Sequence, residues 1–178
     1  MRTIDTEIID LKIIEFDNHP DHRGNFIKAY NEDLFKQLNI NFEIKEIFYS
    51  ISNKDVIRGM HFQTPPFAQD KVVHVQNGEV VDVVLDLRKG SPSYMKCLSF
   101  NLQSSIPKAL YVPKGVAHGF KSLTNNTIMV YMVSEGYVSE YDKGILFSSI
   151  DYDWQIENPV ISDRDRSFPK LCDFETPF

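Results

Sequence analysis

Short runs of apolar residues, many of them β-branched, recur along most of the chain and are separated by polar turn sequences. The apolar positions alternate loosely over residues 4–16, which predicts one or two short strands. Convincing helical spacing occurs only at residues 32–38, where Leu34, Phe35 and Leu38 share one face. Further strands are predicted at residues 43–52, 71–75, 79–87, 96–102, 109–112 and 127–133. Short strands at this spacing, with so little helix, favour an all-β sandwich or barrel.

Glycine, proline and asparagine mark the ends of these predicted strands. Residues 18–21 (Asn-His-Pro-Asp) have the composition of a turn. Asn77-Gly78 separates two β-branched runs, which predicts a hairpin between the strands that flank it. The tail from residue 158 onward is polar and contains prolines, so we expect loop and short helix there. No linker or repeat interrupts the chain, and residues 1–178 are predicted to form a single domain.

Composition and charge narrow the function classes. A formal net charge of −6 argues against a general surface for nucleic acids or anionic membranes, although an anionic substrate could still bind in a locally basic pocket. No apolar run approaches the ~20 residues of a membrane-spanning helix, and the N-terminus lacks the apolar core of a signal peptide. The two cysteines, Cys97 and Cys172, have no metal-binding spacing. We therefore expect a cytoplasmic protein with reduced thiols.

Residues 57–63 combine a cation, a glycine and an imidazole near the end of one predicted strand. The three are Arg58, Gly59 and His61. Histidine is the side chain whose ordinary pKa, about 6.5, lies near neutral pH, which suits it to moving protons. A histidine in such a strand is also typical of a core residue bonded to a backbone carbonyl, and His61 alone does not distinguish the two.

Two carboxylates interrupt a strand that is otherwise suited to burial. Asp82 and Asp86 are an even number of residues apart, so they are predicted to share one face. Buried carboxylates need partners, and Lys71, which opens the preceding strand, is a candidate partner for one of them. Such a pair can be purely structural, or the lysine can stabilise an enolate oxygen that develops on a carbonyl substrate.

Further candidates for the chemistry lie in the second half of the chain. His118 follows a predicted strand and, with His61, raises the hypothesis of a metal site. Residue 63 is glutamine, so no close His-x-His pair exists, and we expect no metal. Tyr131 and Tyr137 could each serve as a general acid or simply line a rim. Near the end of the chain, Ser162-Asp163-Arg164-Asp165 is typical of a charged turn, and either of its aspartates could orient a histidine.

Taken in order, these motifs resemble those of the dTDP-4-dehydrorhamnose 3,5-epimerase family. The resemblance extends over residues 21–165 and implies an all-β fold, the cupin-type double-stranded β-helix (jelly roll) with a few short peripheral helices. It rests on Asp-x-Arg-Gly-x-Phe at 21–26, Ser-x-Ser at 50–52, Arg-Gly-x-His-Phe-Gln at 58–63, Lys-Val-Val-x-Val at 71–75, Asp-x-x-x-Asp-Leu-Arg at 82–88, Pro-x-Gly-x-Ala-His-Gly-Phe at 113–120 and Ser-x-x-Asp at 162–165.

The resemblance implies a role for each matching residue. His61 becomes the base, Asp165 its orienting carboxylate, Tyr137 the acid on the opposite face of the sugar, and Lys71 the group facing the C4 oxygen. Substrate-binding positions are Arg23, Phe26, Lys28, Glu46, Phe48, Arg58, Gln63, Asp82 and His118. The implied substrate is a nucleotide-diphospho-4-keto-6-deoxy sugar, inverted at C3 and C5 without a cofactor. The implied assembly is a homodimer in which an N-terminal segment completes the neighbour's site.

Several positions depart from the family pattern. Lys28 replaces a usual glutamate, and Glu46-Ile47-Phe48 replaces a frequent Gln-Asp-Asn. Phe147 stands where tryptophan is expected, and Ser139 where proline follows the tyrosine. A GDP- or CDP-linked sugar, a heptose, or inversion at one carbon therefore remain alternatives. More remote alternatives are a 3,4-ketoisomerase, a metal-dependent oxygenase and a non-catalytic sugar-binding protein.

Overall fold

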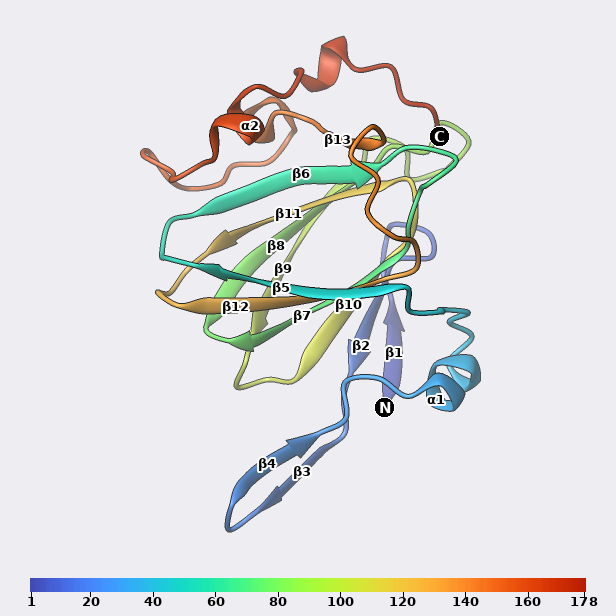
Figure 1. The fold of residues 1–178 in the computed structure, drawn as a ribbon, viewed down its shortest axis with the longest axis vertical. Helices are drawn as coiled ribbons and strands as arrows, with labels where there is room; N and C mark the ends of the chain where they lie inside the picture. The colour runs from blue at the N-terminus through green and yellow to red at the C-terminus, as the bar shows by residue number, and fades with distance from the viewer.

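Two facing antiparallel sheets form the body of the protein (Figure 1). The computed structural model describes all residues, 1–178. The first sheet has six strands in the order β1-β2-β10-β7-β12-β5, and the second has five in the order β13-β6-β11-β8-β9. The strands are β1 (Arg2–Asp5), β2 (Lys12–Glu15), β5 (Glu46–Ser52), β6 (Ile57–Gln63), β7 (Lys71–Asn77), β8 (Glu79–Asp86), β9 (Cys97–Gln103), β10 (Lys108–Val112), β11 (Val116–Ser122), β12 (Thr127–Val133) and β13 (Asp142–Gly144). The predicted all-β architecture is confirmed.

Helix is confined to short peripheral segments, as predicted. They are α1 (Glu32–Gln37), α2 (Asp163–Arg166) and the 3-10 turns η1 (Phe147–Ser149) and η2 (Leu171–Asp173). The side chain of Asn31 caps α1 by accepting a hydrogen bond from the backbone N–H of Leu34, and Phe35 is the buried residue of this helix. Ser162 caps α2 in the same way, through the N–H of Asp165.

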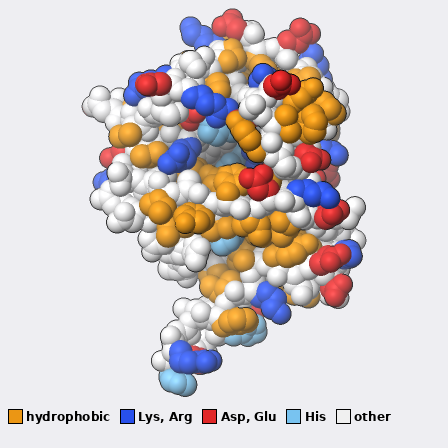
Figure 2. All heavy atoms as spheres, in the orientation of Figure 1, with side chains coloured by type: hydrophobic (Ala, Val, Ile, Leu, Met, Phe, Trp, Pro, Cys, Tyr) orange, Lys and Arg blue, Asp and Glu red, His pale blue; other side chains and the backbone are white.

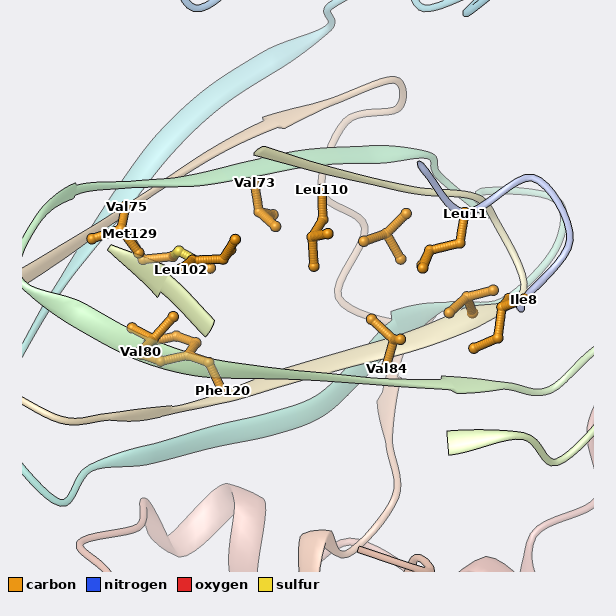
Figure 3. Packing of buried hydrophobic residues seen from close by; sticks show 12 residues of the cluster. Ile8, Leu11, Val73, Val75, Val80, Val84, Leu102, Leu110, Phe120 and Met129 are labelled. Carbon is orange, nitrogen blue, oxygen red and sulfur yellow. The ribbon is translucent and has the colours of Figure 1, made fainter. Parts of the chain in front are cut away.

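The main core lies between the two sheets, where side chains from both inner faces meet (Figure 3). Along β8 the alternation of a strand assigns Val80 and Val84 to this core and Val83 and Leu85 to a second core. The second core lies on the outer face of the five-stranded sheet, where residues of the C-terminal segment such as Trp154 cover it. Because both faces of β8 are buried, its sequence is a nearly continuous apolar run rather than an alternation of apolar and polar residues.

The structure corrects two turn predictions. The Asn77-Gly78 hairpin prediction is wrong, because β7 and β8 belong to different sheets and the turn carries the chain from one sheet to the other. Gly78 has a φ of +85°, and a Cβ there would meet the hydroxyl groups of Thr124 and Thr127. Residues 18–21 are not a turn but a strand, β3 (Asn18–Asp21), which pairs with β4 (Gly24–Ile27). This hairpin projects away from both sheets (Figure 1).

No helix of the chain has the length and apolarity that would let it span a bilayer.

Candidate active site

A cavity of about 260 Å³ opens between the sheets and contains most of the predicted chemistry. Figure 2 shows it as a hollow with histidine side chains inside it and charged side chains of both signs around it. Side chains from β5, β6, β7, β11 and β12, from the β6–β7 loop and from the segments after β12 line the cavity. They are Glu46, Phe48, Ser50, Arg58, His61, Gln69, Lys71, His118, Tyr131, Val133, Tyr137, Asp142 and Arg164.

His61 is held by a carboxylate from the far end of the sequence. Its Nε2 lies 2.9 Å from Oδ1 of Asp165, and Oδ2 of the same carboxylate accepts a hydrogen bond of 3.1 Å from the backbone N–H of Gly59. Burial opposes ionisation of Asp165, but the hydrogen bond and charge of His61, the N–H of Gly59 and the hydroxyl of Ser162 outweigh it and lower the pKa of the carboxyl. An ionised Asp165 holds the Nε2 proton and leaves Nδ1 free to accept one.

The neighbours of His61 fix the plane of its ring. Phe168 packs edge-on against the imidazole, with centroids 5.6 Å apart. Across the β6–β13 pair, Gly144 lies opposite His61, and a Cβ at Gly144 would overlap the ring of Phe168. The absence of a side chain at Gly144 therefore leaves room for Phe168 to support the histidine.

Lys71 enters the cavity from the first position of β7. Its side chain is only 7% exposed, and Nζ donates to the backbone carbonyl of His61 at 3.3 Å. Burial lowers the pKa of its ammonium group to about 8, while the charges of Asp142 and Asp82 act in the opposite direction. An amine with such a pKa is still mostly protonated at pH 7 and can change its charge near neutrality.

The two carboxylates of β8 face the same side, as predicted, but have different partners. Asp82 accepts a hydrogen bond from Nε2 of His118 at 2.8 Å, and no hydrogen bond joins it to Lys71. Burial raises the pKa of the Asp82 carboxyl against the pull of His118 and Lys71, and its Oδ1 has no partner. Asp86 instead forms a structural cluster at the end of the strand with Arg88, Ser91 and Ser93.

Tyr137 lies at the mouth of the cavity, and its side chain is 64% exposed. Its backbone N–H donates to Oε2 of Glu46 at 3.1 Å. On either side of the tyrosine, the carbonyl of Gly136 and the N–H of Val138 bond to the side-chain amide of Gln63. Gln63 is buried and does not line the cavity.

The sequence comparisons agree with this geometry. A model of the dTDP-4-dehydrorhamnose 3,5-epimerase family matches residues 5–173. The chain belongs to this family. It is 38% identical over 176 residues to the dTDP-4-dehydrorhamnose 3,5-epimerase of Shigella flexneri, with 97% of each chain covered.

Solved structures of family members superpose closely on this member. The dTDP-4-dehydrorhamnose 3,5-epimerase of Bacillus anthracis with TDP and pyrophosphate bound has a TM-score of 0.93 and 36% identity, covering 96% of this chain and 99% of that one. The dTDP-6-deoxy-D-glucose-3,5-epimerase of Legionella pneumophila in complex with dTDP-4-keto-L-rhamnose has a TM-score of 0.92 and 31% identity, covering 98% and 94%. These neighbours establish the cupin-type jelly roll for this chain.

Five of the nine predicted substrate-binding residues do not line the cavity of this epimerase-family chain. Gln63 and Asp82 are buried next to it, and the other three lie on or beside the β3–β4 hairpin. Arg23, Phe26 and Lys28 belong to the β3–β4 hairpin or follow it directly, and none of them lines the cavity. Arg23 forms an ion pair with Asp21, and the Phe26 side chain is 63% exposed. Within one chain these residues do not meet His61.

Other residues of the cavity were not singled out from the sequence. Gln69, Val133 and Asp142 line it, and Arg164 holds Asp142 through an ion pair of 2.6 Å. Arg164 adjoins Asp165 in a charged turn sequence, and that proximity was the available signal. For Gln69, Val133 and Asp142 the sequence offered none. No group of three or more His, Cys, Asp or Glu side chains is arranged to hold a metal ion.

Proposed function

We propose that this protein is an isomerase that inverts C3 and C5 of dTDP-4-dehydro-6-deoxyglucose to give dTDP-4-dehydrorhamnose. The observation that carries the proposal is the convergence of the His61–Asp165 pair, Lys71 and Tyr137 on one cavity of a family member. A ketone at C4 acidifies the protons on C3 and C5. A base, a cation for the enolate oxygen and a second proton donor are the groups that such inversions need.

Each group has one task in this proposal. Nδ1 of His61 removes the proton from C3 or C5, and Asp165 stabilises the imidazolium that forms. Protonated Lys71 stabilises the enolate oxygen at C4. The hydroxyl of Tyr137 then donates a proton to the opposite face of the carbon. Tyr137 recovers a proton from solvent and His61 releases the abstracted one to solvent, which restores both groups for the second centre. The oxidation level of the sugar is unchanged, so the reaction consumes no redox partner.

Substrate binding is assigned to cations and rings around the same cavity. Arg58 is fixed by hydrogen bonds from its guanidinium to the hydroxyl of Ser52 and the carbonyl of Ile51, and it offers a positive charge to the diphosphate. His118, oriented by Asp82, is placed to contact the sugar. Gln63 and Asp82, which are buried beneath the lining residues, serve this site indirectly.

We further propose that the protein acts as a homodimer of single-domain subunits. In this assembly the β3–β4 hairpin of one subunit completes the other subunit's site with Arg23, Phe26 and Lys28. The hairpin is exposed on both strands, so its backbone and the Phe26 ring, which is 63% exposed, are free to contact a neighbouring subunit.

The departures from the family pattern bear on which sugar nucleotide is used. Glu46 places a carboxylate at the cavity mouth, and Phe48 stacks on Tyr131 with centroids 4.7 Å apart. Together with Lys28, they change the charge and polarity at positions assigned to the base and sugar. A GDP- or CDP-linked substrate, a heptose, or inversion at a single carbon are therefore the alternatives that the first experiment must separate.

The test is to incubate the purified protein with dTDP-, GDP- and CDP-linked 4-keto-6-deoxy sugars. Proton NMR then follows the ring configuration. Inversion at both C3 and C5 of the dTDP sugar supports the proposal. Inversion at one centre, or only with another nucleotide, redirects it to the corresponding alternative. Binding without any change in configuration contradicts it and favours a sugar-binding protein.

A further inference from the structure

We propose that Gln63 is a positioning residue that holds the proposed acid Tyr137 in place opposite the base. The inference rests on the proposed epimerase function and adds a residue that touches neither substrate nor reacting atoms. It replaces the substrate-binding role that the sequence suggested for Gln63.

Both the nitrogen and the oxygen of the Gln63 amide form hydrogen bonds with the loop at residues 136–138. Its Nε2 donates to the carbonyls of Phe67, at 2.9 Å, and Gly136, at 3.1 Å, and its Oε1 accepts from the N–H of Val138 at 2.7 Å. The side chain is 2% exposed, so water does not replace these bonds at low cost. The amide therefore brackets Tyr137 from both sides along the backbone.

The aromatic ring of Tyr137 has no comparable support of its own. Its phenol oxygen makes no hydrogen bond within the chain, and most of its side-chain surface is exposed. Its position is set through the backbone, by Gln63 at the two neighbouring residues and by Glu46 at its own N–H. Loss of the Gln63 bonds would leave the Glu46 bond and the bonds that the Val138 carbonyl accepts from the N–H groups of Tyr141 and Asp142. No bond would then hold the Gly136 side of the tyrosine to β6, and the ring could move.

Gln63 also links this loop to the base. It lies two residues after His61 on β6, so the two side chains point to the same face at a Cα separation of ~6.6 Å. Strand β6 is paired with β11 on one side and β13 on the other, which fixes its position in the sheet. One well-anchored strand thus carries the base and, through Gln63, sets the distance to the acid.

If Gln63 has this role, its loss should affect inversion of the sugar far more than exchange of its protons with solvent. Removal of a substrate proton by His61 followed by return of a solvent deuteron to the same face gives exchange with retained configuration. Inversion requires Tyr137 as well. If Tyr137 is misplaced, exchange at C3 and C5 continues, while formation of inverted product falls.

The decisive variant is Gln63→Met, which keeps the length of the side chain and removes all three hydrogen bonds. In deuterated buffer we expect the ratio of inversion to exchange to fall at least tenfold relative to wild type. Gln63→Glu keeps the acceptor for Val138 and should recover part of the ratio. Val80→Ala, a core change at the start of β8, serves as the control for general destabilisation and should leave the ratio unchanged.

An unchanged ratio in Gln63→Met, with both rates lowered together, would overturn the inference and leave Gln63 a structural residue. So would a Val80→Ala variant that shifts the ratio as much. Should Gln63→Met not fold, Gln63→Glu alone decides by the same ratio. A wild-type protein that inverts no substrate would instead refute the proposed function, so the two failures are distinguishable.

Discussion

Replacing Lys71 by methionine should abolish most of the activity and stabilise the fold at the same time. The ammonium of Lys71 is buried between the sheets, and its charge is needed only for the proposed enolate. Methionine has a similar length and volume but no charge, so the core position stays filled. An opposite effect on activity and stability is characteristic of a strained functional group rather than of a structural ion pair.

The expected gain in stability of Lys71→Met follows from the pKa of Lys71. It falls from 10.5 to about 8 because burial disfavours the charged form more than Asp142 and Asp82 favour it. Such a shift corresponds to about 3 kcal/mol of unfolding free energy at pH 7. This is a ceiling, because Asp82 loses the nearby positive charge in the variant.

Proton linkage determines how the stability difference between the wild type and Lys71→Met changes with pH. Between pH 8 and 10.5 the unfolded chain holds a proton on Lys71 that the folded protein has released, so the stability of the wild type rises with pH in this window. The advantage of Lys71→Met should therefore be full below pH 8 and disappear toward pH 10.5.

Chemical denaturation at fixed protein concentration, repeated from pH 6.5 to pH 10, measures this difference. We expect kcat of the variant to fall by on the order of 10²–10³-fold. The kcat/KM of the wild type should decline above pH about 8, as Lys71 loses its proton. A variant no more stable than the wild type at pH 7, or a stability difference that is constant with pH, would refute the reasoning.

Three further predictions concern the rest of the site. Asp165→Asn should lower kcat by on the order of 10³–10⁴-fold with little change in KM, because an amide no longer enforces the Nε2–H tautomer of His61; unchanged kcat in steady-state kinetics would contradict this. Gly144→Ala should displace Phe168, which lowers the free energy of unfolding by ~1–3 kcal/mol and reduces kcat. Thermal unfolding measures the loss of stability, and an unaltered melting curve would argue against the contact. Arg23→Ala and His61→Asn subunits, each inactive alone, should recover roughly a quarter of wild-type activity when mixed and allowed to exchange; no recovery would place Arg23 in its own subunit's site.

The fold was predictable where local patterns are unambiguous. The β-branched runs, the single helical spacing at Glu32–Gln37 and the shared face of Asp82 and Asp86 all appear in the structure. The hairpin prediction at Asn77-Gly78 failed because a tight turn is a local property. Which sheet the next strand joins depends on contacts with strands distant in the sequence, and no local signal carries that choice.

The sequence motifs name several residues that the fold brings to one cavity, but they do not name the contacts that hold those residues in place. His61, Lys71 and Tyr137 line one cavity, but nothing in the sequence places the Gly136–Val138 loop beside Gln63. That contact is made by two segments more than 70 residues apart, and it exists only once β6 and the end of β12 are in position. The contacts of the exposed β3–β4 hairpin were equally out of reach of the sequence, because the proposed partner for it lies in another subunit.

The most direct test of the central claim is deuterium incorporation into dTDP-4-keto-6-deoxyglucose by the wild type and by His61→Asn, followed side by side by NMR. The account predicts deuterium at both C3 and C5 with the wild type and no exchange above the enzyme-free rate with the variant. Exchange by His61→Asn at the wild-type rate would contradict the role of His61 as the base.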